Sequence, residues 1–123
     1  MIVWCRITMG TEPGRSPEGN EELMREEGAQ MQRSLTVGVI GDFDPSSVPH
    51  VSTNTALDHA AAALGIPVTV SWLPTPSLGS GEAPGLESYD GLWCSPGSPY
   101  RSMDGALAGI RFAREKGWPF FAT

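Results

Sequence analysis

Residues 89–123 read YDGLWCSPGSPYRSMDGALAGIRFAREKGWPFFAT and carry the clearest structural pattern of the chain. An apolar strand at Gly91–Cys94 enters the turn Ser95–Pro99, which is followed by an amphipathic helix over about Met103–Lys116 and a second apolar strand over Trp118–Thr123. A strand, a helix and a strand at this spacing predict a right-handed crossover between parallel strands. Because ligands of parallel α/β proteins gather at the carboxyl ends of strands, the turn at Ser95–Pro99 is a candidate site.

The same pattern precedes this stretch. Short apolar runs at Leu35–Gly41 and Ile66–Leu73 predict two further strands, and the sequence between them predicts a helix over about His50–Leu64. Residues 74–84 are rich in Pro, Gly and Ser and predict a surface loop. The predicted inward positions are Leu57, Ala60, Ala61 and Leu64 on the first helix and Met103, Ala106, Leu107, Ile110 and Ala113 on the second, with Gly65 and Gly117 as the helix ends.

Charge and composition exclude several classes of protein. The chain has 123 residues, a formal net charge of −6 and two cysteines. No basic stripe is present to neutralise phosphates, and no run approaches the roughly 18 apolar residues of a membrane span, so we expect neither a nucleic-acid nor a membrane partner. Two cysteines make neither a disulfide framework nor a metal site, so we expect a cytoplasmic protein without a cofactor.

The charged residues are unevenly distributed along the chain. The chain has 8 basic and 14 acidic side chains. Residues 1–33 hold ten of these charged side chains and few bulky apolar ones. Such a segment buries too little apolar surface to offset its ordering entropy. We therefore predict a poorly ordered tail over residues 1–33 and a folded domain over residues 34–123.

Few side chains outside the turn suggest chemistry. Cys94 lies within a predicted strand and is expected to be a buried, unreactive thiol. His50 and His59 have no partner at metal-site spacing and are expected to be solvated. Asp42 and Asp44 follow an apolar strand in an Asp-x-Asp arrangement, which could supply a nucleophile, an acid or base and a Mg²⁺ ligand, although no later Asp pair completes a metal site.

Two longer runs, YDGLWCSPGS at residues 89–98 and GIRFAREKGWPFFAT at residues 109–123, resemble class I glutamine amidotransferase domains, and within that family the glutaminase half of CTP synthases. Weaker matches are the glycines Gly38 and Gly41 of the first strand, the helical segment Thr55–His59 and the strand end at Trp72 and Leu73. The resemblance covers about residues 34–123. It implies a flavodoxin-like α/β fold, of which these residues are an incomplete half-domain with about four strands.

The resemblance also implies an activity. Such enzymes hydrolyse L-glutamine with a Cys nucleophile, a His base and a Glu, and supply the ammonia for CTP synthesis from UTP. The nucleophile would be the residue after Thr123, so this chain is expected to be truncated just before it, to hold no catalytic residue and to be inactive. What remains is an oxyanion- or glutamine-binding turn at Gly97 and Ser98, in which Ser98 replaces a second Gly.

Two alternatives remain open on the sequence alone. The chain could be a non-catalytic module that docks on a complete amidotransferase or associates with itself. Less consistent with the pattern is a Mg²⁺-dependent phosphatase of the haloacid dehalogenase type that uses Asp42 and Asp44.

Overall fold

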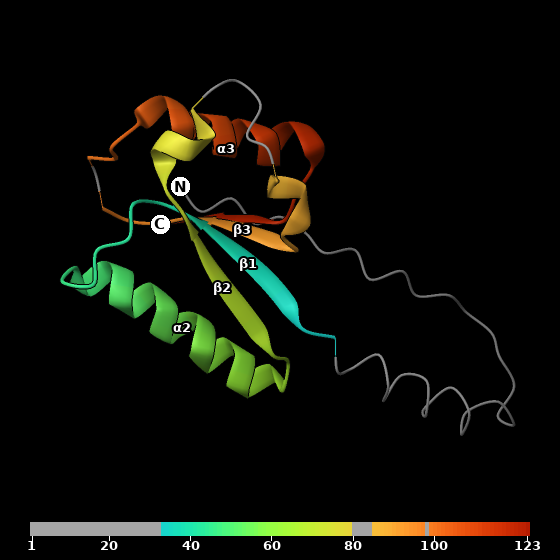
Figure 1. The fold of residues 1–123 in the computed structure, drawn as a ribbon. Coiled ribbons are helices and arrows are strands. Elements are labelled where there is room, and N and C mark those ends of the chain that lie inside the picture. Colours follow the sequence, from blue (N-terminus) through green and yellow to red (C-terminus); the bar gives the residue numbers. More distant parts are fainter. Residues whose placement is uncertain (1–32, 80–84, 98) are drawn as a thin grey trace, which may run out of the picture.

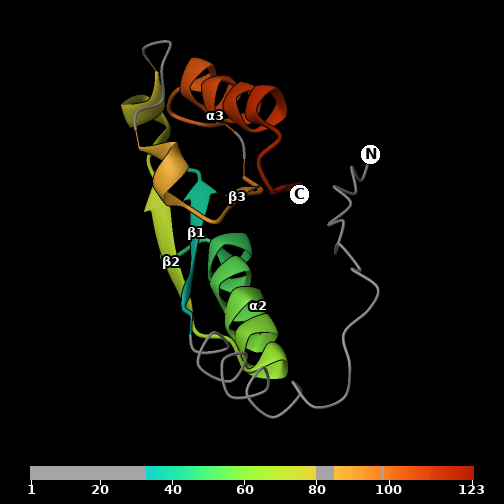
Figure 2. The ribbon, with the colours of Figure 1, turned by 90° about the vertical axis from the view of Figure 1, so that its right-hand side faces the viewer.

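A computed structural model of the chain describes residues 33–79, 85–97 and 99–123. The predicted tail lies outside these ranges except for Arg33, and Ser98 lies outside them as well. Within them, four strands form one parallel sheet with a helix on each face (Figure 1 and Figure 2). This architecture confirms the predicted α/β class and the incomplete half-domain.

The strands are β1 (Leu35–Ile40), β2 (Val68–Leu73), β3 (Gly91–Cys94) and β4 (Phe120–Ala122). They lie in the order β2-β1-β3-β4, and every neighbouring pair is parallel. The sequence predicts all four strands, and the predicted ends of β1, β2 and β4 extend one or two residues beyond the observed ones. Prolines precede β2 and β4, where no ladder donor is needed.

The helices α2 (Val48–Leu64) and α3 (Met103–Lys116) lie on opposite faces of the sheet (Figure 2). The crossover through α2 carries the chain from β1 to β2, and the crossover through α3 carries it from β3 to β4, in the opposite direction. Because both crossovers are right-handed, their helices cover different faces. The strand order therefore reverses between β1 and β3, which opens a crevice at their carboxyl ends.

The larger part of the core lies under α3. It consists of Ile40, Leu78, Leu86, Leu92, Cys94, Ala106 and Ala113, each at most 5% exposed. The Ser102 hydroxyl caps α3 by accepting a hydrogen bond from the N–H of Gly105 at 3.1 Å. The helix ends at Gly117 in the left-handed conformation, as predicted.

The predicted inward face of α3 is wrong in part. Met103 and Leu107 are about half exposed, at 53% and 46%, whereas Gly105 and Gly109 are buried together with the predicted Ala106 and Ala113. The reason is close packing: a Cβ on Gly109 would lie 2.6 Å from the side chain of Ile40, and one on Gly105 would overlap the carbonyl oxygen of Thr75. The helix turns its glycines toward the core because their lack of a Cβ lets it pack closely against Thr75 and Ile40.

Two further expectations need correction. Helix α2 faces the sheet with His50 and Thr53, which are buried, while the predicted inward Leu64 is 71% exposed. The predicted loop over residues 74–84 contains a short 3₁₀ helix, η2 (Thr75–Leu78), whose Thr75 and Leu78 are 0% and 4% exposed. A second 3₁₀ helix, η3 (Leu86–Ser88), precedes β3 and buries Leu86.

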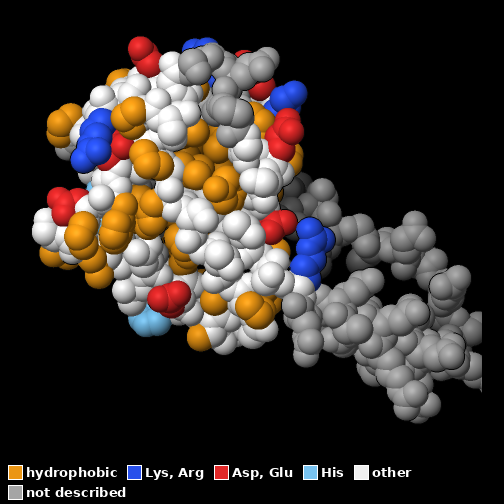
Figure 3. All heavy atoms as spheres, in the orientation of Figure 1, with side chains coloured by type: hydrophobic (Ala, Val, Ile, Leu, Met, Phe, Trp, Pro, Cys, Tyr) orange, Lys and Arg blue, Asp and Glu red, His pale blue; other side chains and the backbone are white. Residues whose placement is uncertain are grey.

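Polar and apolar side chains are mixed on the surface. On the face drawn in Figure 3, basic and acidic side chains are interspersed and do not form a patch of one sign. At the outer strand of the sheet, Phe121 remains 44% exposed and packs edge-on against Trp93, with ring centroids 4.9 Å apart. In the described part of the chain, no helix is both long and apolar enough to cross a membrane.

Candidate functional site

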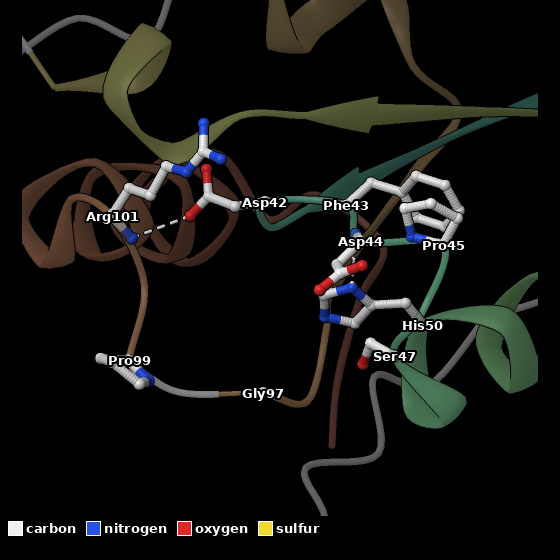
Figure 4. Close-up of a pocket in the computed structure, with 9 residues that line it drawn as sticks. All are labelled: Asp42, Phe43, Asp44, Pro45, Ser47, His50, Gly97, Pro99 and Arg101. Carbon is white, nitrogen blue, oxygen red and sulfur yellow. Dashed lines mark hydrogen bonds between the residues drawn. The ribbon is translucent and has the colours of Figure 1, made fainter.

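The carboxyl ends of β1 and β3 border an open pocket of about 510 Å³ (Figure 4). The loop between β1 and α2, the first turn of α2 and the turn between β3 and α3 form it. The lining residues are Asp42, Phe43, Asp44, Pro45, Ser47, His50, Gly97, Pro99 and Arg101. The pocket thus lies where the strand order reverses, which is where open α/β sheets bind ligands. It includes the predicted turn residue Gly97.

His50, in the first turn of α2, connects the loop after β1 to the turn after β3. Its Nδ1 accepts a hydrogen bond from the backbone N–H of Asp44 at 3.0 Å, and its Nε2 lies 3.2 Å from the carbonyl oxygen of Pro96. The side chain is only 6% exposed. The expectation of a solvated His50 is therefore wrong, because the side chain is buried and both ring nitrogens pair with backbone groups of the protein.

Gly97 occupies a conformation that other residues rarely adopt. Its φ is +110°, and a Cβ at this position would lie 2.9 Å from Nε2 of His50. Both the backbone angle and the space therefore require glycine. The glutamine-binding role predicted for Gly97 stays a prediction, and Ser98, the other predicted turn residue, lies outside the described residues.

Asp42 joins the loop after β1 to Thr75 and Arg101 through three hydrogen bonds. Its carboxylate accepts from the backbone N–H and the hydroxyl of Thr75, at 2.9 and 2.7 Å, and from the backbone N–H of Arg101 at 2.9 Å. The Thr75 hydroxyl oxygen in turn accepts from the N–H of Ser102 at 2.9 Å. Partial burial opposes ionisation, yet these hydrogen bonds and the Arg101 charge lower the pKa of Asp42 below its ordinary value of 3.8.

Replacing Asp42 with Asn should destabilise the fold by about 1–2 kcal/mol, because one amide oxygen cannot replace a carboxylate that accepts three hydrogen bonds. The lowered pKa of Asp42 adds stability above the unfolded-state pKa, and this contribution is lost as the pH falls through the folded-state pKa. The difference in unfolding free energy between the wild type and Asp42→Asn should therefore shrink below about pH 4. Urea unfolding across pH measures it.

The matched control for this prediction is Asp58→Asn. Asp58 is exposed on α2, so its replacement should change the unfolding free energy by no more than about 0.5 kcal/mol. Equal effects of the two substitutions at neutral pH would contradict the role given to Asp42.

The Asp44 side chain makes its hydrogen bonds within its own loop. One carboxylate oxygen accepts hydrogen bonds from the hydroxyl and the backbone N–H of Ser46, at 2.7 and 2.8 Å, and these bonds lower the pKa of Asp44. Across residues 33–79, 85–97 and 99–123, no three His, Cys, Asp or Glu side chains gather in a way that could hold a metal ion. The carboxylates of Asp42 and Asp44 both accept hydrogen bonds from the protein, Asp42 from Thr75 and Arg101 and Asp44 from Ser46, and the phosphatase alternative stays a prediction.

The remaining predicted residues lie apart from the pocket. Cys94 is buried in β3, as expected, with its Sγ 3.3 Å from the hydroxyl of Tyr100. That hydroxyl donates to the carbonyl oxygen of Ser95 at 2.6 Å, and burial first, then the neighbouring thiol, raises the pKa of Tyr100. His59 is exposed on α2, as expected.

Sequence reasoning missed His50 and Arg101 as site residues. From the sequence, His50 is expected only to be a solvated side chain without partners at metal-site spacing, and Arg101 is not singled out. A usable signal is their position: His50 follows the end of β1 at Ile40 by ten residues, and Arg101 follows the end of β3 at Cys94 by seven. In a parallel sheet such residues converge on one edge.

Comparison with known proteins shows that the chain is related to part of CTP synthases. It is 34% identical over 90 residues to a CTP synthase of Novosphingobium aromaticivorans, and this match covers 71% of this chain and 17% of that protein. It is 29% identical over 113 residues to a CTP synthase of Symbiobacterium thermophilum, covering 87% and 21%. With a CTP synthase of Rhodopseudomonas palustris it shares 29% over 109 residues, covering 88% and 19%.

The chain therefore spans about a fifth of the length of these relatives. No protein-family model matches it.

Proposed function

We propose that residues 34–123 form part of a glutamine amidotransferase domain of the CTP synthase type, and that the turn at Gly97 contributes to the site where glutamine is hydrolysed. The observation that carries this proposal is the turn itself, a glycine with φ +110° at the carboxyl end of β3, beside the crevice where the strand order reverses. The similarity to CTP synthases of several bacteria supports the same assignment.

The chemistry explains why such a turn is useful. When a thiolate attacks the side-chain amide carbon of glutamine, the C=O bond becomes a single bond and its oxygen carries the negative charge. Backbone N–H groups that are oriented in advance stabilise this charge. The intermediate then collapses: the nitrogen receives the proton that the thiol gave to the His base, the C–N bond breaks and ammonia leaves. Water then hydrolyses the thioester to glutamate and the free thiol. The ammonia would aminate UTP to CTP.

The arrangement of the sheet supports a nucleophile beside this turn. β4 lies beside β3, with Cys94 opposite Ala122, and the N–H of Thr123 is 3.4 Å from the carbonyl oxygen of Cys94. A thiol carried just beyond the carboxyl end of β4 would therefore lie next to the turn that contains Gly97. Cys94 cannot take this part, because it is buried within β3.

A chimeric enzyme tests the proposal. The matched 90-residue stretch of the Novosphingobium aromaticivorans CTP synthase is replaced by the corresponding residues of this chain, and CTP formation is followed with glutamine or with ammonia as nitrogen source. We expect activity with both. Gly97→Ala in the chimera should lower the glutamine-dependent rate by roughly a hundredfold or more, since it displaces an oxyanion donor, and leave the ammonia-dependent rate unchanged.

The matched control is Gly91→Ala in the same chimera. A Cβ on Gly91 would come no closer than 3.7 Å to its neighbours, so both rates should be retained. A chimera that makes CTP from ammonia but not from glutamine, with Gly97 in place, would show that these residues do not serve glutamine hydrolysis.

A further inference from the structure

We propose that His50 is a positioning residue that fixes the orientation of the peptide between Pro96 and Gly97. The importance of this peptide for glutamine hydrolysis depends on the function proposed above. We call the two hydrogen bonds of His50, to the N–H of Asp44 and to the carbonyl of Pro96, the clamp. The clamp depends only on these contacts and can be tested without any substrate.

The hydrogen bonds of His50 define its tautomer. The backbone N–H of Asp44 can only donate, so the Nδ1 that receives it carries no proton. In the neutral imidazole the proton is then on Nε2, which donates to the carbonyl oxygen of Pro96 at 3.2 Å. One ring thus ties the loop after β1 to the turn after β3, and His50 and Pro96 themselves lie 46 residues apart along the chain.

The surroundings of His50 hold the ring in place. Trp72 packs against the imidazole with centroids 4.9 Å apart, and Phe43 stacks on it at 6.1 Å. The indole N–H of Trp72 donates to the side chain of Asn54 at 2.8 Å, which anchors the indole to α2. With only 6% of its surface exposed, the imidazole has little room to rotate away from Pro96.

A held carbonyl also sets the direction of the adjoining N–H. The carbonyl of Pro96 and the N–H of Gly97 belong to one planar trans peptide, in which they point in opposite directions. Since Nε2 of His50 binds the carbonyl oxygen, the N–H of Gly97 points away from His50. Glycine has no Cβ to restrict its backbone, so without the clamp this peptide could turn over and lose its alignment as an oxyanion donor.

Three variants separate the two hydrogen bonds. His50→Gln places a donor where Nε2 lies and can keep the bond to Pro96, whereas His50→Asn places an acceptor where Nδ1 lies and can keep the bond from Asp44. His50→Phe keeps an aromatic ring but neither bond. His59→Phe, at an exposed position of the same helix, is the control.

The measurements are made by NMR on the complete 123-residue chain without glutamine. In the wild type, scalar couplings across the two hydrogen bonds should join the amide nitrogen of Asp44 to Nδ1 and the carbonyl carbon of Pro96 to Nε2. Residual dipolar couplings of the Gly97 N–H report its orientation. We expect this orientation to survive in His50→Gln and His59→Phe and to be lost in His50→Asn and His50→Phe.

The wild-type couplings keep the proposal testable even if a variant does not fold. A protonated Nδ1 in the wild type would overturn the clamp, and so would an unchanged Gly97 orientation in a folded His50→Asn or His50→Phe protein. Neither result would affect the chimeric enzyme assay. Conversely, a chimera without glutamine-dependent activity would refute the proposed function and leave the clamp standing.

Discussion

A purified polypeptide of these 123 residues should release no measurable ammonia from glutamine. Its cysteines are Cys5 and Cys94, and Cys94 is buried in β3 against Tyr100. Removing a nucleophile that works as a unit with its base typically costs on the order of a million-fold in rate. Under the proposed function these residues supply only part of an oxyanion site, which leaves little catalysis by itself. Ammonia release from L-glutamine, followed with a coupled assay, measures the effect.

The positive control is a full-length relative such as the Novosphingobium aromaticivorans CTP synthase, assayed in parallel. The same preparation of the 123-residue chain is then treated with a thiol-alkylating reagent. Turnover above a heat-inactivated sample that disappears on alkylation would refute the prediction and identify a reactive cysteine. Cys94→Ser would then show whether the buried thiol is responsible.

The strands and helices were predictable because their signals are local. Each strand is a short apolar run between Gly, Pro or small polar residues, and α3 was predicted over the same residues, Met103–Lys116, that form it. Gly65 and Gly117 end the helices in the left-handed conformation, which other residues disfavour. The parallel order then follows from the alternation of strands and helices.

The pocket was only partly predictable, because most of its contacts join residues far apart in the chain. Gly97 could be identified from the turn sequence alone. The burial of His50 depends on the carbonyl of Pro96, and the role of Asp42 depends on Thr75 and Arg101. No periodicity within a helix or a loop reveals such partners, so a polar side chain near a strand end was assigned to solvent.

The glycine face of α3 shows a second limit of sequence patterns. Hydropathy ranks Met103 and Leu107 as core residues and gives Gly105 no preference, yet the glycine is buried and both larger side chains are about half exposed. What decides is the distance between α3 and η2, where the helix approaches the backbone of Thr75. That distance is set by the hydrogen bonds of Thr75 to Asp42 and Ser102, which are tertiary contacts.

Gly105→Ala should therefore destabilise the fold even though alanine is the better helix former. Helix propensity alone favours the substitution by roughly 1 kcal/mol. The added methyl group, however, would overlap the carbonyl oxygen of Thr75, a backbone atom that cannot move without breaking the contacts of η2. Overpacking of this kind costs about 3 kcal/mol, against roughly 5–13 kcal/mol for a whole fold of this size. Thermal unfolding should show a midpoint lowered by roughly 10–20 °C.

Gly109 and Gly91 serve as comparisons for Gly105, because substitution with alanine adds the same methyl group at each position. At Gly109 the added methyl would lie 2.6 Å from the end of the Ile40 side chain, which can rotate, so we expect a smaller loss of about 1 kcal/mol. At Gly91 the nearest atom is the carbonyl oxygen of Pro119 at 3.7 Å, an ordinary contact, and stability should change by no more than about 0.5 kcal/mol. The order of the three effects, with Gly105 largest, follows from what each methyl meets. If Gly105→Ala raised the unfolding midpoint instead, helix propensity would outweigh the contact, and α3 could not lie as close to η2 as the structure places it.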